Sequence, residues 1–98
     1  MAGHDEPQYR LAIVAELVQV PPDTIRRYER QGLVHSQKHG GERLYSERSV
    51  VRIRRIVSVT GMGVNTQGAD VVCNLLERLE QIQSERDALR EQLRRLLD

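Results

Sequence analysis

The chain has 98 residues, of which 39% are hydrophobic and 30% are charged, with a net charge of +1 and one cysteine. This length predicts one small domain, alone or with an extension, whose limited core would gain stability from a partner subunit. A single cysteine excludes a disulfide framework within the chain and a Cys-x-x-Cys zinc site, and it fits a reducing compartment.

The N-terminal segment is polar. Residues 1–8 include Pro7, and we expect them to form a disordered N-terminus. They lack the basic and apolar segments of a secretory signal peptide, and no apolar run in the chain approaches the length of a membrane span. We therefore expect a cytoplasmic protein with no membrane partner.

Two short helices are predicted next. Apolar residues recur at spacings of three and four from Tyr9 to Val20, which predicts an amphipathic helix. It ends before Pro21, because a proline disfavours the helical conformation of the preceding residue. A second helix is predicted from Pro22 to about Gln31, because proline suits the first turn and Gly32 suits a left-handed C-terminal cap. Two helices joined by so short a turn form a helix-turn-helix.

A hairpin with basic side chains is predicted after the second helix. Leu33–Val34 and Arg43–Tyr45 flank a polar segment that ends in two glycines, and we expect them to pair as a two-stranded wing. From Thr24 to Arg55, nine Lys and Arg residues stand against three acidic residues, so most of the positive charge is concentrated there. Concentrated positive charge favours a polyanion through counterion release. A basic helix with a basic wing is typical of proteins that grip duplex DNA.

Two further helices are predicted in the second half of the chain. Ser46 is expected to cap a third helix, which carries an apolar stripe and stops at residues 61–63. Asn65 or Thr66 is expected to cap a fourth helix. Cys73, on that fourth helix, is interpreted as a small buried apolar residue rather than a redox-active or metal-sensing thiol.

The C-terminal segment repeats apolar residues at alternating spacings of three and four, which is a heptad seam. An apolar seam on an isolated helix has nowhere to be buried, so we expect it to pair with a second chain. A charged residue in the seam costs stability unless it pairs or reaches solvent. The residues assigned to dimerisation are Leu75, Leu79, Ile82, Arg86, Leu89, Leu93 and Leu96.

Two motifs carry a resemblance to a known family. Residues 22–33 follow the pattern Pro-x-Thr-x-Arg-x-Tyr-Glu-x-x-Gly-Leu, and residues 43–46 follow Arg-x-Tyr-Ser. In this order the chain resembles the MerR family of bacterial transcription regulators from Tyr9 to Leu76. Within that family it is most similar to the heat-shock repressors, through the arginine-rich second helix, the glycines before Arg43, and residues 63–65.

The resemblance implies an all-α fold with a small two-stranded wing: a winged helix-turn-helix domain over residues 9–76 and a dimerisation coiled-coil helix over residues 77–98. It also implies a nucleoid-associated homodimer with an antiparallel coil, bound to an inverted repeat in double-stranded DNA. It further implies repression of the chaperone operon with the Hsp70 chaperone DnaK as co-repressor. The chain departs from the family at Arg27, where many members carry Tyr, and at Pro21, where they often carry Ser.

Most candidate DNA contacts lie on the second helix and the wing, and one, Arg54, lies on the third helix. Arg26 and Arg27 could each hold a guanine edge or clamp a phosphate. Tyr28 either donates its hydroxyl to a phosphate or packs its ring on the first helix. Glu29 is interpreted as structural, either paired with a neighbouring arginine or capping the turn. Tyr45 is interpreted as a residue that packs at the base of the wing and could also donate to a phosphate. The predicted DNA-binding residues are Thr24, Arg26, Arg27, Tyr28, Arg30, Lys38, Arg43, Tyr45 and Arg54.

No catalytic or metal-binding motif is present in the sequence, so we expect a protein without enzymatic activity or cofactor. Three other functions remain open. The chain could be a MerR-type activator that distorts a promoter spacer. It could be a protein-interaction module whose basic face binds DNA without specificity, or an excisionase-like architectural protein, although such proteins usually lack a dimerising coil.

Overall fold

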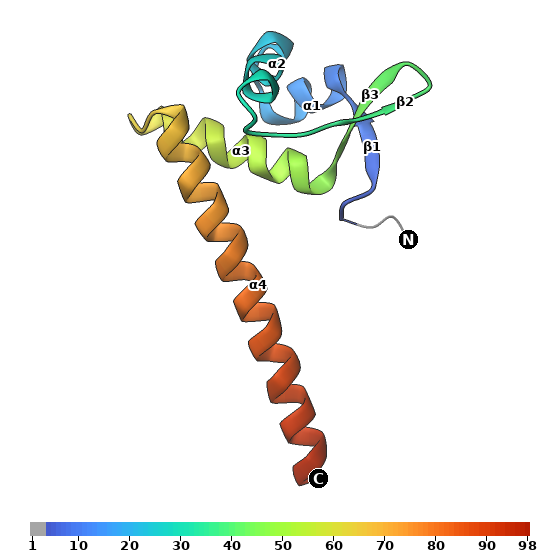
Figure 1. Cartoon of the computed structure of the whole chain (residues 1–98), viewed down its shortest axis with the longest axis vertical. Coiled ribbons are helices and arrows are strands. Elements are labelled where there is room, and N and C mark those ends of the chain that lie inside the picture. The colour runs from blue at the N-terminus through green and yellow to red at the C-terminus, as the bar shows by residue number, and fades with distance from the viewer. Residues whose placement is uncertain (1–3) are drawn as a thin grey trace.

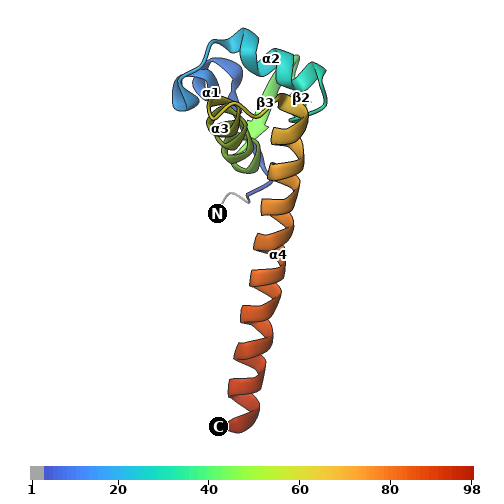
Figure 2. The same cartoon turned by 90° about the vertical axis from the view of Figure 1, so that its left-hand side faces the viewer.

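The structure is a computed structural model that describes residues 4–98, and it consists of a small domain from which one long helix projects (Figures 1 and 2). Residues 1–3, part of the segment predicted to be disordered, lie outside the described residues. The described elements, in chain order, are β1 (Pro7–Arg10), α1 (Leu11–Val18), α2 (Pro22–Arg30), β2 (Gln37–His39), β3 (Glu42–Ser46), α3 (Glu47–Gly61) and α4 (Thr66–Leu97).

The sheet corrects two predictions. It is a three-stranded antiparallel sheet in the order β1-β3-β2, not a two-stranded wing. The predicted disorder is wrong for Pro7 and Gln8, which lie in β1, and Pro7 is opposite Ser46 on β3. Arg48 holds the segment before β1, because its N–H donates to the His4 carbonyl at 3.1 Å and its guanidinium pairs with Asp5 at 2.6 Å.

The wing also differs from the prediction in its first strand. Leu33 and Val34 do not pair with β3; they follow shortly after α2, and their side chains are buried in the core. The strand that pairs with β3 is instead β2, with Lys38 opposite Arg43. All three residues of β2 are exposed and polar, so no apolar alternation marks this strand in the sequence.

The helix boundaries follow local signals with one exception. Pro22 begins α2, and Gly32 beyond its end has a φ of 77°, as predicted. The Ser46 hydroxyl accepts from the Ser49 N–H at 3.1 Å, and the Asn65 side chain accepts from the Gly68 N–H at 2.7 Å, so Asn65 is the cap of α4. The exception is α1, which begins at Leu11, because the two residues before it belong to β1.

One core joins the sheet to all four helices. Its largest fully buried side chains include Tyr45, Ile25 and Ile53, and the first turns of α4 contribute Ala69 and Cys73. After these turns α4 continues without a break across the predicted domain boundary at residues 76 and 77. Figures 1 and 2 show its C-terminal part projecting away from the domain. Among the described residues, no helix is long and apolar enough to cross a membrane.

The projecting part of α4 leaves its seam uncovered. The apolar seam side chains from Leu75 to Leu96 keep between 46% and 82% of their surface exposed in the single chain. The Arg86 guanidinium pairs with Asp87 on the same helix at 2.9 Å, and half of its side chain stays exposed. The charge in the seam therefore has both a partner and access to solvent.

Candidate nucleic-acid interface

The cationic face of α2, which we define as Arg26, Arg27 and Arg30, is exposed. The Arg26 guanidinium pairs with Asp23 at 2.8 Å, an exposed contact between neighbouring turns. The Arg27 guanidinium lies 5.6 Å from the centre of the Tyr28 ring, and Arg30 makes no ion pair with any residue of the range 4–98. Two of the three cations are thus free of carboxylates and available to an external anion.

Glu29 holds the wing against α2. Its carboxylate accepts from the Tyr45 hydroxyl at 2.6 Å, and from the Arg43 guanidinium and the Ser36 hydroxyl at 2.8 Å each. We call these four residues the Glu29 cluster. It confirms the interpretation of Glu29 as structural and paired with an arginine. α2 and the hairpin lie on the side of the domain away from the C-terminal end of α4 (Figure 1).

The two predicted tyrosines both have buried rings. Tyr45 is buried, and its hydroxyl is used by Glu29, so the structure supports wing-base packing rather than a direct DNA contact. The Tyr28 ring is also buried, in the core that contains α1. No buried side-chain oxygen of the described residues lacks a hydrogen-bond partner, so the unbonded Tyr28 hydroxyl lies at the surface. Both alternatives for Tyr28 are therefore compatible with its position.

The remaining predicted contacts lie on three elements. Thr24 is half-buried in the first turn of α2, and Lys38 is exposed on β2. Arg43 belongs to the Glu29 cluster, although 57% of its side chain stays exposed. Arg54 is exposed on α3, with a guanidinium nitrogen 3.3 Å from the Leu17 carbonyl of α1. The structure thus brings Arg43 beside α2 but places Arg54 against α1.

Two further arginines of α3, Arg52 and Arg55, pair with carboxylates of α4. Arg52 contacts Asp70 and Glu77, and Arg55 makes two hydrogen bonds with Glu80, at 2.9 and 3.1 Å. The sequence contained a signal for this arrangement. The carboxylates of α4 recur at helical spacing, which predicts one acidic face on that helix.

The Tyr45 phenol should make stability depend on pH. Burial, followed by its hydrogen bond to Glu29, raises the pKa of Tyr45 to about 12. Because an unfolded tyrosine has a pKa of about 10, the unfolded chain releases this proton first as the pH rises. The contribution of protonated Tyr45 to the free energy of unfolding is therefore complete below about pH 10, and it is lost as the pH rises through about 12. In urea unfolding, the stability advantage of the wild type over Tyr45→Phe should shrink by up to about 2–3 kcal/mol over this window. If the free energy of unfolding of the wild type and of Tyr45→Phe changed in parallel with pH, the raised pKa of Tyr45 would be contradicted.

Cys73 occupies the predicted apolar position. The side chain is fully buried, with its Sγ 3.9 Å from the Arg52 carbonyl, and burial raises the pKa of the thiol. A raised pKa lowers the thiolate fraction and hence the reactivity. Within residues 4–98, no group of three or more His, Cys, Asp or Glu side chains is arranged to hold a metal ion.

Comparison with known proteins places this geometry in context. Residues 9–76 match the family described as MerR HTH family regulatory protein. The chain is 29% identical over 82 residues to the putative heat shock protein HspR of Streptomyces coelicolor, covering 82% of this chain and 54% of that protein. It is 34% identical over 61 residues to the HTH-type transcriptional regulator ZntR of Escherichia coli K12, covering 60% of this chain and 43% of that protein. The chain spans about half the length of the curated relatives it matches.

Proposed function

The chain belongs to the MerR family of helix-turn-helix regulatory proteins, and from this premise we propose that it represses heat-shock or chaperone genes as a homodimer on an inverted repeat. Proteins of this family bind DNA and regulate transcription. The finer assignment to heat-shock genes is supported by the similarity to HspR. We further propose that the protein acts in the cytoplasm at the nucleoid, with the Hsp70 chaperone DnaK as co-repressor.

The observation that carries the proposal is the cationic face of α2 beside the wing. Arg27 and Arg30 have no carboxylate partner among the described residues, and the Glu29 cluster holds Arg43 on the neighbouring strand. A helix in the major groove with a basic hairpin on the flanking backbone needs this juxtaposition. In the proposed dimer, the seam of α4 would pair with its counterpart and present two such faces to two half-sites.

Fluorescence anisotropy tests this function. A duplex with the inverted repeat upstream of the chaperone operon would be compared, at one salt concentration, with a scrambled duplex, each with and without DnaK. We expect a preference for the repeat of about a thousandfold or more, increased further by DnaK. Equal, salt-sensitive binding to both duplexes would instead favour an architectural or protein-interaction role. The position of the bound site relative to the promoter would separate a repressor from an activator that distorts the promoter spacer.

A further inference from the structure

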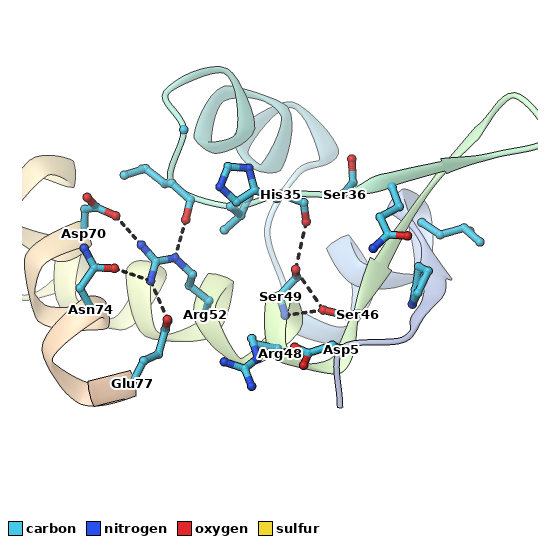
Figure 3. A pocket seen from close by; sticks show the side chains of 16 residues that line it. Asp5, His35, Ser36, Ser46, Arg48, Ser49, Arg52, Asp70, Asn74 and Glu77 are labelled. Atoms are coloured by element: carbon cyan, nitrogen blue, oxygen red, sulfur yellow. Dashed lines mark hydrogen bonds and ion pairs between the residues drawn. The ribbon is translucent and has the colours of Figure 1, made fainter. Parts of the chain in front are cut away.

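Arg52 connects the loop after α2, which is the recognition helix proposed to enter the major groove, to the long helix α4. Its side chain is only 13% exposed and lies in a pocket between the loop after α2, helix α3 and helix α4 (Figure 3). The Nε atom donates to the carbonyl of Leu33, three residues beyond the end of α2. The terminal nitrogens donate to Asn74 at 3.1 Å, to Glu77 at 2.6 Å, and to Asp70.

These partners lie on one face of α4. Asp70, Asn74 and Glu77 follow one another at spacings of four and three, which places them in a row along one side of a helix. Figure 3 shows the Arg52 guanidinium between this row and the loop that carries the Leu33 carbonyl. One planar group therefore contacts both the DNA-binding domain and the helix that leaves it.

The contact is directional, unlike the apolar packing around it. Ala69 and Cys73 are fully buried at the base of α4, and burial of apolar surface depends little on orientation. A guanidinium instead donates along fixed directions in one plane, which lysine cannot reproduce. Arg52 can therefore define the rotation and tilt of α4 relative to α2.

A small change in this tilt would matter at the scale of DNA. An α-helix rises about 1.5 Å per residue, so the 32 residues of α4 extend over about 48 Å. A tilt of roughly 4° at its base would move its far end by about 3.4 Å, one base-pair step. In a dimer joined through α4, the distance between the two recognition helices depends on this angle.

We propose that Arg52 is a positioning residue that determines which half-site spacing the dimer accepts. It contacts no base or phosphate in this role. It acts through the Leu33 carbonyl on one side and through Asp70, Asn74 and Glu77 of α4 on the other. The inference rests on the proposed function, since it requires a dimer that binds two half-sites.

Two steps test the inference: selection of a preferred duplex from randomised DNA, and binding to duplexes that differ in the number of base pairs between the half-sites. The wild type is first used to enrich its preferred duplex, which gives the half-sites and the number of base pairs between them. Anisotropy then compares this duplex with versions in which one base pair is inserted or removed at the centre. The test variant is Arg52→Lys, which keeps the positive charge beside Asp70 and Glu77 but loses the planar fork.

Arg55→Lys is the matched control. This substitution makes the same chemical change one helical turn away, in the ion pair that Arg55 of α3 makes with Glu80 of α4. Within the described part of the chain, Arg55 makes no hydrogen bond to the loop after α2. We expect the wild type and Arg55→Lys to lose about tenfold or more in affinity on respacing by one base pair, and Arg52→Lys to lose less than about threefold. A folded, dimeric Arg52→Lys protein with the wild-type spacing preference would overturn the inference.

A second variant tests the proposal even if Arg52→Lys does not fold. Asn74→Ala combined with Glu77→Gln weakens the same link from α4, at an exposed and a half-buried position, with no change in the domain core. It should broaden the spacing preference in the same way, and an unchanged preference would count against the proposal. If the wild type itself enriches no repeated half-site, the proposed function fails, and the two failures are therefore distinguishable.

Discussion

Replacing Leu79 and Leu89 together by glutamate will convert the proposed dimer into a monomer and lower its affinity for an inverted repeat by at least about 100-fold. Both side chains belong to the seam of α4 and are exposed in the single chain, at 49% and 64%. The substitutions therefore leave the core of the DNA-binding domain unchanged. In a dimer, they would place four carboxylates in an apolar interface, where burying unpaired charge is costly. Linking two half-site contacts in one molecule multiplies affinity, and that gain is lost in the monomer.

Sedimentation velocity and anisotropy measure the two effects separately. Ser84→Glu combined with Ala88→Glu is the matched control, because it adds two charges to the same helix outside the seam. We expect the control to remain dimeric and to bind the repeat like the wild type. A seam variant that stays dimeric would show that another surface holds the two chains together, and a monomer with undiminished affinity would exclude cooperative use of two half-sites.

Replacing Arg27 and Arg30 together by alanine should lower operator affinity by about a hundredfold or more, since each arginine–DNA contact contributes roughly 1–3 kcal/mol. Both side chains are exposed on α2 and have no carboxylate partner within residues 4–98. Their loss should thus affect DNA binding while leaving the folded domain intact. Anisotropy at several salt concentrations measures the loss of affinity and also distinguishes contacts to phosphate from contacts to bases.

The salt dependence separates phosphate contacts from base contacts. Each phosphate contact contributes about 0.9 to the slope of log affinity against log salt, and a dimer has every contact twice. An arginine that holds phosphate should therefore flatten the slope by about 1.8 when it is removed, whereas one that contacts a base edge should mainly reduce discrimination between sequences. Arg94→Ala combined with Arg95→Ala, the same loss of charge at the far end of α4, serves as control. Equal losses in both double variants would indicate a general charge effect.

Local signals in the sequence were sufficient for the helices that position the site. Pro22 and Gly32 bracket α2, and Ser46 caps α3, because each of these residues acts on backbone within one turn of itself. The cationic face of α2 follows directly from helical spacing. These features need no knowledge of distant parts of the chain.

The features that were missed depend on distant partners. β1 is a strand because Tyr9 and Arg10 pair with Tyr45 and Leu44, more than thirty positions away, and its own composition gives no comparable signal. The contact between the Tyr45 hydroxyl and Glu29 depends in the same way on a partner from another element.

The two outer strands also govern how this sheet behaves toward other protein molecules. An open strand edge is a template for aggregation, and proteins limit it with short strands, proline, irregular register and charge. β1 carries Pro7 and a shift in register between Pro7 and Tyr9, while β2 has three residues with Lys38 at its centre. β3 lies between them with both of its edges paired. The sheet thus presents no long, regular edge onto which a fibril could grow.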